Sequence, residues 1–209
     1  MKTLFTALLL TLPLALCAAE KVSLSDGKTF KGWEGDTNKT WRIEDGAFVG
    51  GSLKARVPRN EFLRSTRPYT NFVLRLKFKL VGPTPGADIN GGVQVRSQQA
   101  KNPPSEMVGY QCDMGPGWWG ALYDESRRNR PLIKPAPAVV EKAVKKGEWN
   151  EYLIRCEGKR IQNFINDVAM IDYTEPEAAI PQWGLLGLQI HGGGPAEASY
   201  KDITIEELP

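Results

Sequence analysis

A strict alternation of residue types from Phe72 to Leu80 constrains the fold more than any other feature of this sequence. In "FVLRLKFKL" every second residue is Phe or Leu, and Arg75, Lys77 and Lys79 fall between them. Successive side chains of a β-strand point to opposite faces, whereas a helix would scatter these apolar residues around its circumference. The stretch therefore predicts an antiparallel strand with one buried and one solvated face.

Shorter stretches of the same kind recur along the chain, separated by turn residues. They are "TWRIEDGAFVG", "GGVQVRS", "GYQCDM", "NEYLIRCEGKRIQNFIND", "WGLLGLQIHGG" and "ASYKDITIEEL". Asp45-Gly46 and Gly158-Lys159 have the composition of hairpin turns. Only "PAVVEKAVKKGEW" indicates a helix, of about three turns at most. Many short strands joined by turns predict an all-β domain, built as a sandwich or a barrel.

The N-terminal residues 1–19 have the pattern of a secretory signal peptide. "MKTLFTALLLTLPLALCAA" combines a Lys near the start, a short apolar run and a small-residue end. Cleavage after Ala19 would leave residues 20–209 as one exported domain, periplasmic or secreted. Alternatively, Cys17 in "LALC" carries a lipid that anchors the chain to a membrane, although Leu16 stands where a small residue is usual.

The charge balance indicates which partners to exclude, and the cysteine content indicates whether a disulfide can form. The 27 Lys and Arg residues nearly balance 24 Asp and Glu residues, for a net charge of +3, and no basic run is interleaved with aromatic residues. We therefore expect no nucleic-acid partner. Cys112 and Cys156 both lie in strand-like stretches, and in an oxidising compartment they would form either a disulfide or two separately buried thiols.

Three predicted strands each carry a spaced pair of polar residues on one face. The pairs are Gln94 and Arg96, Gln111 and Asp113, and Gln189 and His191. If the strands are neighbours, these six side chains line one surface while Val93 and Val95 face the core. Such groups suit sugar hydroxyls, which both donate and accept, but an ordinary solvated face also carries them. Their repetition and the neighbouring Gly91-Gly92 and Gly192-Gly193 pairs favour a ligand site.

Aromatic and titratable residues near these strands have two interpretations each. Trp118 and Trp119 lie in a Gly- and Pro-rich break, where they either stack on a ligand or pack into the core, as expected for Trp33, Trp41, Trp149 and Trp183. The single histidine, His191, is either a general base or a surface residue. Asp88, Asn90 or Asp113 would suit calcium, but "GADINGG" lacks the full spacing of a calcium loop.

The order of these stretches, from about Leu24 to the C-terminus, resembles the bacterial 3-keto-disaccharide hydrolase family. The stretches "NGGVQVRS", "GYQCDMG", "GALYDESRR" and "GLLGLQIHGG" carry the resemblance, whereas Asn166-Asp167 stands where the family often has Asn-Gly. The resemblance implies a concanavalin A-like jelly roll of two antiparallel sheets, one of them concave. It also implies activity on glucosides oxidised at C3, as a hydrolase or as a 1,2-lyase with glucal hydratase activity. Its motifs fall on Arg96, Gln111, Asp113, Tyr123, Asp124, Glu125, Arg128, Gln189, His191 and Gly193.

The chemistry of a 3-keto sugar suggests roles for these residues. The keto group acidifies the hydrogen at C2, so a base can form an enolate that expels the C1 substituent. The candidates for the base are His191, Asp113 and Glu125. The enolate oxygen would be stabilised by Arg96, by Arg128 or by a divalent metal ion. Glu125 is the candidate for the acid that protonates the leaving oxygen. Direct hydrolysis by Asp113 and Glu125 is the alternative. The expected substrate-binding residues are Gln94, Gln111, Trp118, Trp119, Tyr123, Asp124, Arg128 and Gln189.

A non-catalytic carbohydrate-binding module on the same fold is the competing class, because a fold alone does not decide a function. Such a module would need Trp118, Trp119 and Gln111 but no base, so His191 would not matter. A purely structural envelope protein is the weakest alternative, because it gives no reason for Arg, Asp and His to share a polar strand face. The expected partner is a small carbohydrate.

Overall fold

The computed structural model describes residues 20–209. The predicted signal peptide and Cys17 therefore lie outside the described residues. Within the described part of the chain, no helix has the length and apolar character needed to cross a membrane.

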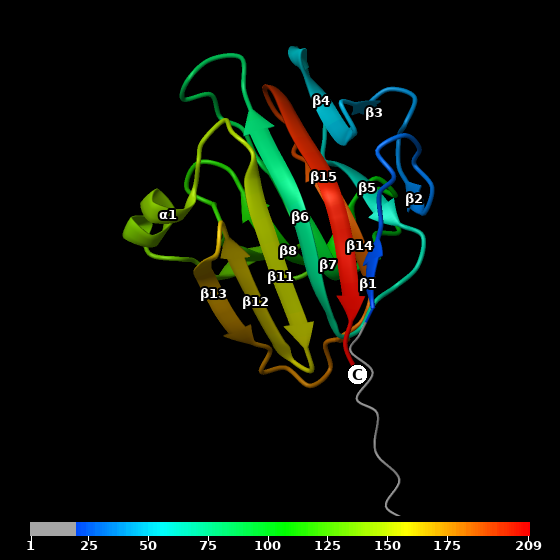
Figure 1. The fold of residues 1–209 in the computed structure, drawn as a ribbon, viewed down its shortest axis with the longest axis vertical. Coiled ribbons are helices and arrows are strands. Elements are labelled where there is room, and N and C mark those ends of the chain that lie inside the picture. The colour runs from blue at the N-terminus through cyan, green and yellow to red at the C-terminus, as the bar shows by residue number, and fades with distance from the viewer. Residues whose placement is uncertain (1–19) are drawn as a thin grey trace, which may run out of the picture.

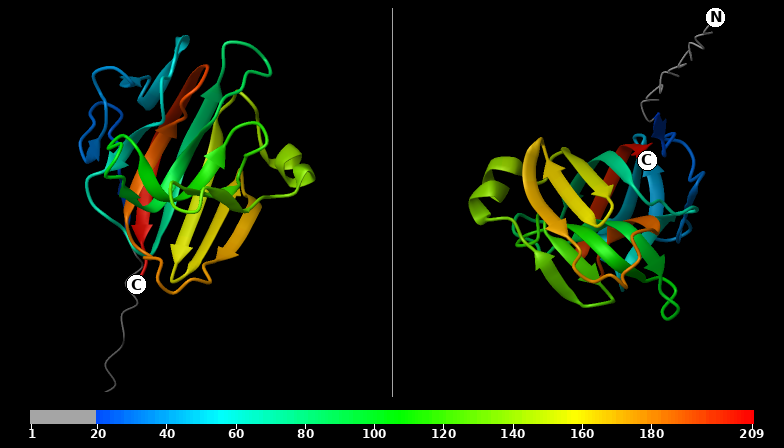
Figure 2. Two further views of the ribbon diagram at one scale, coloured as in Figure 1. Left: turned by 180° about the vertical axis from the view of Figure 1, so that it is seen from behind. Right: turned by 90° about the horizontal axis from the view of Figure 1, so that it is seen from below.

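Two antiparallel sheets lie face to face and enclose the core (Figures 1 and 2). The eight-stranded sheet has the order β13-β12-β11-β6-β15-β4-β3, and β1 pairs with β15. Its strands are β1 (Lys21–Ser23), β3 (Trp41–Glu44), β4 (Ala47–Arg56), β6 (Phe72–Val81), β11 (Asn150–Glu157), β12 (Arg160–Ile165), β13 (Val168–Thr174) and β15 (Pro195–Glu207).

The seven-stranded sheet has the order β10-β9-β8-β7-β14-β5-β2. Its strands are β2 (Trp33–Glu34), β5 (Glu61–Ser65), β7 (Gly91–Gln99), β8 (Met107–Met114), β9 (Leu122–Glu125), β10 (Arg130–Ile133) and β14 (Leu185–Ile190). The predicted all-β, concanavalin A-like jelly-roll sandwich of two antiparallel sheets is confirmed.

The core consists of the inward-facing residues of both sheets. Strand β6 has the predicted alternation, with Phe72, Leu74, Leu76, Phe78 and Leu80 at most 3% exposed. The opposing sheet contributes Val93 and Val95, both fully buried. Because burial of apolar surface is the main driving force of folding, these two faces hold the sandwich together.

The turns and the helix follow from local chemistry. Asp45 and Gly46 adopt φ angles of 50° and 75° in the predicted hairpin between β3 and β4. Asp and Gly tolerate this left-handed region better than most residues do. The predicted helix is α1 (Pro137–Ala143), only seven residues long, which ends where Val144 turns to an extended conformation.

Both cysteines of the described chain are free, buried thiols, so the alternative without a disulfide is the correct one. Burial raises the pKa of Cys156 to about 12, which keeps this thiol neutral. Among the tryptophans expected in the core, Trp33 and Trp41 are buried, but Trp183 is 50% exposed and the expectation is wrong there.

Candidate functional site

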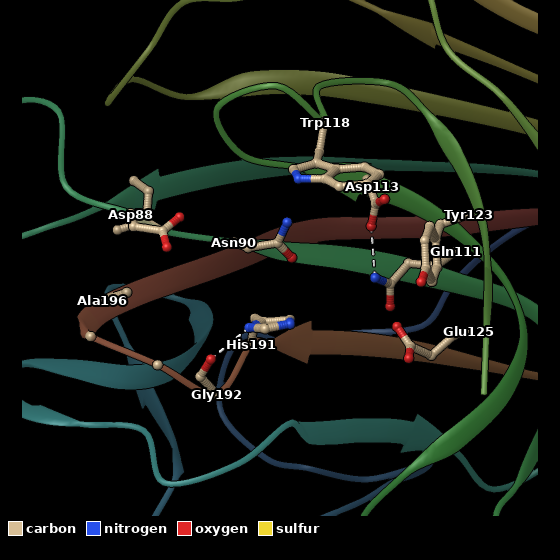
Figure 3. A pocket seen from close by; sticks show the side chains of 13 residues that line it. Asp88, Asn90, Gln111, Asp113, Trp118, Tyr123, Glu125, His191, Gly192 and Ala196 are labelled. Carbon is tan, nitrogen blue, oxygen red and sulfur yellow. Dashed lines mark hydrogen bonds between the residues drawn. The ribbon is translucent and has the colours of Figure 1, made fainter. Parts of the chain in front are cut away.

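A pocket of about 330 Å³ opens on the outer face of the seven-stranded sheet (Figure 3). Strands β8 and β9, the turn between them, the loop before β7 and the segment after β14 build it. Its lining residues are Asp88, Ile89, Asn90, Gln111, Asp113, Trp118, Tyr123, Glu125, His191, Gly192, Gly193, Gly194 and Ala196.

A row of hydrogen-bonded amides forms the base of the pocket. The strand register pairs Gln94 with Gln111 and Gly92 with Asp113, and Gln189 with Gly92 on the other side. Gln111 Nε2 donates to Asp113 Oδ1 at 2.7 Å and to Gln189 Oε1 at 3.1 Å, while Gln94 Nε2 donates to Gln111 Oε1 at 3.1 Å. Gln111 and Asp113 line the pocket. Gln94 and Gln189 are fully buried, do not line the pocket, and hold Gln111 in place through these hydrogen bonds.

Glycines in these strands make room for side chains of the protein itself. A Cβ added at Gly92 would lie 2.7 Å from Gln111 Cγ, and one at Gly187 would lie 2.4 Å from Met107 Sδ. Both distances are below van der Waals contact. The close approach that glycine permits is therefore used here by Gln111 and Met107.

Two carboxyl groups of the pocket have strongly raised pKa values. Asp113 is 3% exposed, and burial raises its pKa to about 8 against the opposing effects of the Gln111 hydrogen bond and Lys134. Burial also raises the pKa of Glu125 to about 7, with a further contribution from the negative charge of Glu106. At neutral pH, Asp113 is therefore largely protonated and Glu125 is near half-protonated, so both can donate a proton or a hydrogen bond.

His191 lies at the rim of the pocket, immediately after β14, and is exposed. Its Nδ1 lies 2.6 Å from the carbonyl oxygen of Gly192. A carbonyl oxygen only accepts hydrogen bonds, so the neutral ring places its proton on Nδ1. The lone pair of Nε2 is then available to accept a proton.

An aromatic wall closes one side of the pocket. The rings of Trp118 and Tyr123 meet edge to face, with centroids 5.7 Å apart. Lys134 Nζ lies 4.1 Å from the Trp118 ring centroid, an arrangement that holds a cation beside the wall. Trp119 is 5% exposed and stacks on Phe78 in the core, so it does not line this pocket.

The expectation that Arg96 shares this surface is also wrong. Arg96 adopts a φ of 49°, and the pairing of β7 with β8 shifts register after Val95. This bulge reverses the direction of the side chain. Arg96 then donates to the carbonyl oxygens of Thr70 at 2.7 Å and Gly158 at 2.6 Å, and to Asn71 Oδ1 at 3.1 Å. The residue joins the ends of the two sheets and does not line the pocket.

We expect Arg96→Lys to change stability rather than the pocket. Lysine is a single donor group and cannot reproduce the fork that bonds Thr70, Gly158 and Asn71 together. The free energy of unfolding should fall by about 2 kcal/mol. Urea unfolding measures this change, and sugar affinity per folded molecule should stay as in the wild type. A weaker affinity for the sugar, without a change in the free energy of unfolding, would show that Arg96 contributes to the binding site.

Asp124 and Arg128 are likewise structural. Side chains alternate along β9, so Tyr123 and Glu125 face the pocket and Asp124, fully buried, faces the opposite side. Asp124 forms ion pairs with Arg127 and Arg128. Arg128 also binds the buried Glu175 at 2.7 Å. The ion pairs satisfy these buried charges, so the expected substrate contacts of Asp124 and Arg128 are wrong.

The loop before β7 contributes residues that the strand pattern did not assign to substrate. Asp88, Ile89 and Asn90 line the pocket, whereas the sequence suggests Asp88 and Asn90 only as calcium ligands. Asn90 Oδ1 is buried and has no hydrogen-bond partner among the described residues. The sequence feature that could have placed these residues in the pocket is the position of "GADINGG" directly before a strand of the polar face. Within residues 20–209, no three His, Cys, Asp or Glu side chains cluster as metal ligands.

Comparison with known protein families supports a carbohydrate-active protein. Residues 20–206 match the model of the 3-keto-alpha-glucoside-1,2-lyase-like domain. The chain therefore belongs to this family, also called the 3-keto-disaccharide hydrolase family. No protein of curated function matches it.

Solved structures establish the fold independently. A protein from Parabacteroides distasonis, provisionally named a glycosyl hydrolase, is 20% identical, with a TM-score of 0.65 over 90% of this chain and 100% of that one. The carbohydrate-binding module CBM66 from Bacillus subtilis is 16% identical, with a TM-score of 0.63 over 84% of this chain and 96% of that one. At these identities the likeness shows the fold alone.

Proposed function

We propose that this protein cleaves the glycosidic bond of 3-keto-glucosides by removing the C2 proton and eliminating the aglycone. The observation that carries the proposal is the presence in one pocket of two carboxyl groups, the buried Asp113 and the half-buried Glu125, with pKa values of about 8 and about 7. Carboxylic acids that remain protonated near neutral pH serve as proton and hydrogen-bond donors. Family membership supports a 3-keto sugar as the substrate.

His191 is the base in this proposal. The Gly192 carbonyl holds the Nδ1 proton, so Nε2 can take the proton from C2. The electrons of the C2–H bond form a C2=C3 double bond, and the C3 carbonyl becomes an enolate oxygen. Asp113, in its protonated form, donates a hydrogen bond to that oxygen, which replaces the role first expected of Arg96 or Arg128.

Glu125 is the acid. The enolate electrons return to form C3=O and a C1=C2 double bond as the bond from C1 to the aglycone oxygen breaks. Glu125 gives its proton to that oxygen, so the products are a free alcohol and a 3-keto-2-hydroxy-glucal. Addition of water, with hydroxyl to C1 and a proton to C2, would give the free 3-keto sugar. Trp118 and Tyr123 offer flat surfaces for the sugar ring.

A panel of 3-keto-glucosides tests the proposal, with glycone and aglycone release followed separately. We expect a glucal product to form before the hydrated sugar. Direct appearance of the 3-keto sugar, with no glucal, would indicate hydrolysis by Asp113 and Glu125 instead. Parallel reactions with a chelator test the contribution of a divalent metal ion.

A carbohydrate-binding module is the second candidate, favoured by the aromatic wall of Trp118 and Tyr123. It would bind glycans through this wall without turning over any 3-keto-glucoside. The same panel separates the two functions, because only the enzyme releases an aglycone.

We also propose export of the protein, because residues 1–19 have the composition of a signal peptide. Mass spectrometry of protein recovered from the producing cells should find Glu20 at the N-terminus. A diacylated Cys17 at the N-terminus would establish the lipid-anchored alternative, and an intact Met1 would contradict export by cleavage.

A further inference from the structure

We infer that an apolar groove beside the pocket is the subsite for an apolar aglycone, so that the substrates are 3-keto-glucosides of aromatic or other ring alcohols. This inference rests on the proposed function. The groove has a volume of about 580 Å³. It is lined by Leu80, Val81, Gly82, Pro83, Thr84, Pro85, Gly86, Ala87, Ile89, Pro116, Trp119, Lys146 and Gly147.

The groove and the pocket share two walls. Ile89 lines both hollows, so they adjoin at the loop before β7. The turn between β8 and β9 also contributes to both, with Trp118 in the pocket and Pro116 and Trp119 in the groove. A molecule whose sugar occupies the pocket (Figure 3) would therefore have the groove as its nearest second surface.

The chemistry of the groove differs from that of the pocket. Among the described residues that line the groove, only Thr84 and Lys146 carry a hydroxyl or a charge. Glycines, prolines, aliphatic residues and Trp119 make up the rest. The pocket instead carries Asp113, Glu125 and other polar groups. Adjacent polar and apolar hollows match a ligand with a polar sugar and an apolar substituent. A second sugar in the groove would lose most of its hydrogen bonds to water.

The groove is formed before any ligand arrives. A Cβ added at Gly82 would lie 2.7 Å from the Cβ of Ala87 and 2.8 Å from Ile89 Cγ2, so the loop packs closely on itself. Trp119 stacks on Phe78 with centroids 6.4 Å apart, which fixes the indole within the core. A preformed apolar surface binds a ring without an added cost of ordering the protein.

Substrates that differ only in the aglycone test this inference. We would compare naphthyl and methyl 3-keto-glucosides, each as both anomers, with the wild type and with Ala87→Glu, which places a charge in the groove. Ala178→Glu, in an exposed turn, is the matched control. Thr84→Glu, at an exposed position of the lining, replaces Ala87→Glu if that variant does not fold.

We expect Ala87→Glu to lower the naphthyl-to-methyl ratio of kcat/KM by about tenfold or more relative to the wild type, because burial of the ring is lost. The better leaving ability of naphthol is the same in both proteins and cancels in this comparison. Ala178→Glu should keep the wild-type ratio, and an unchanged ratio in Ala87→Glu would overturn the subsite.

Binding of unoxidised glucosides separates this inference from the proposed function. If the wild type turns over neither 3-keto substrate, the proposed function fails. The subsite still stands if calorimetry shows naphthyl glucoside binding about tenfold more tightly than methyl glucoside, with the difference lost in Ala87→Glu. Equal affinities for the two glucosides would reject it.

Discussion

His191→Gln should lower turnover of 3-keto-glucosides by roughly 100-fold or more and leave sugar binding largely intact, the usual scale for removal of a positioned base. Glutamine keeps a hydrogen-bonding side chain at the pocket rim but cannot accept a proton near neutral pH. The loss should therefore appear in kcat, with a much smaller change in the dissociation constant of an unoxidised glucoside. Steady-state kinetics and calorimetry measure the two quantities.

The His191→Gln experiment needs a control for substitution by glutamine itself. Lys54→Gln changes an exposed residue of β4 that does not line the pocket, and it should leave both quantities unchanged. Wild-type turnover in His191→Gln would show that another group, Asp113 or Glu125, removes the C2 proton. Glycan binding by a wild type that turns over nothing would establish the binding module instead.

Asp113→Asn should make the protein progressively more stable than the wild type as the pH rises from 4 to above 8. Burial raises the pKa of Asp113 from its usual 3.8 to about 8, so the folded protein holds this proton more tightly than the unfolded chain does. The resulting stabilisation is complete below pH 3.8 and is lost as the pH rises through 8. The free energy of unfolding of the wild type falls by roughly 5 kcal/mol over this range. Asparagine cannot ionise, so the variant does not lose this stability.

Urea unfolding at pH 4, 6 and 9 measures the difference between Asp113→Asn and the wild type. The amide introduced by this substitution keeps an oxygen that accepts the hydrogen bond from Gln111 Nε2, so folding itself should persist. Asp88→Asn, on an exposed carboxylate of the same pocket, is the control and should show no comparable trend. A difference that does not change with pH would show that Asp113 is ionised in the folded protein.

The sandwich and the position of the polar face were predictable because they depend on local alternation. In a strand the side-chain period is two, so the sequence of β6, β7 and β8 already separates core residues from outward residues. The same rule places Tyr123 and Glu125 on one face of β9 and Asp124 on the other. The family resemblance grouped all three, and here the strand period was the better guide.

Two features of the site depend on contacts between distant segments. The bulge after Val95 turns Arg96 away from Gln94, because one extra residue in a strand reverses the faces that follow it. Trp118 and Trp119 are neighbours in sequence, yet only the packing of Trp119 on Phe78 assigns one to the pocket and the other to the core.

By itself, the sequence determined the all-β class, the inward and outward faces of the strands, and the family, since each follows from the order and spacing of residues along the chain. Only the tertiary structure decided the ionisation of Asp113 and Glu125 and the groove that adjoins their pocket. A pKa depends on how much solvent surrounding segments exclude, and a groove depends on how far apart they lie. Both are distances through space, which residue spacing along the chain does not specify.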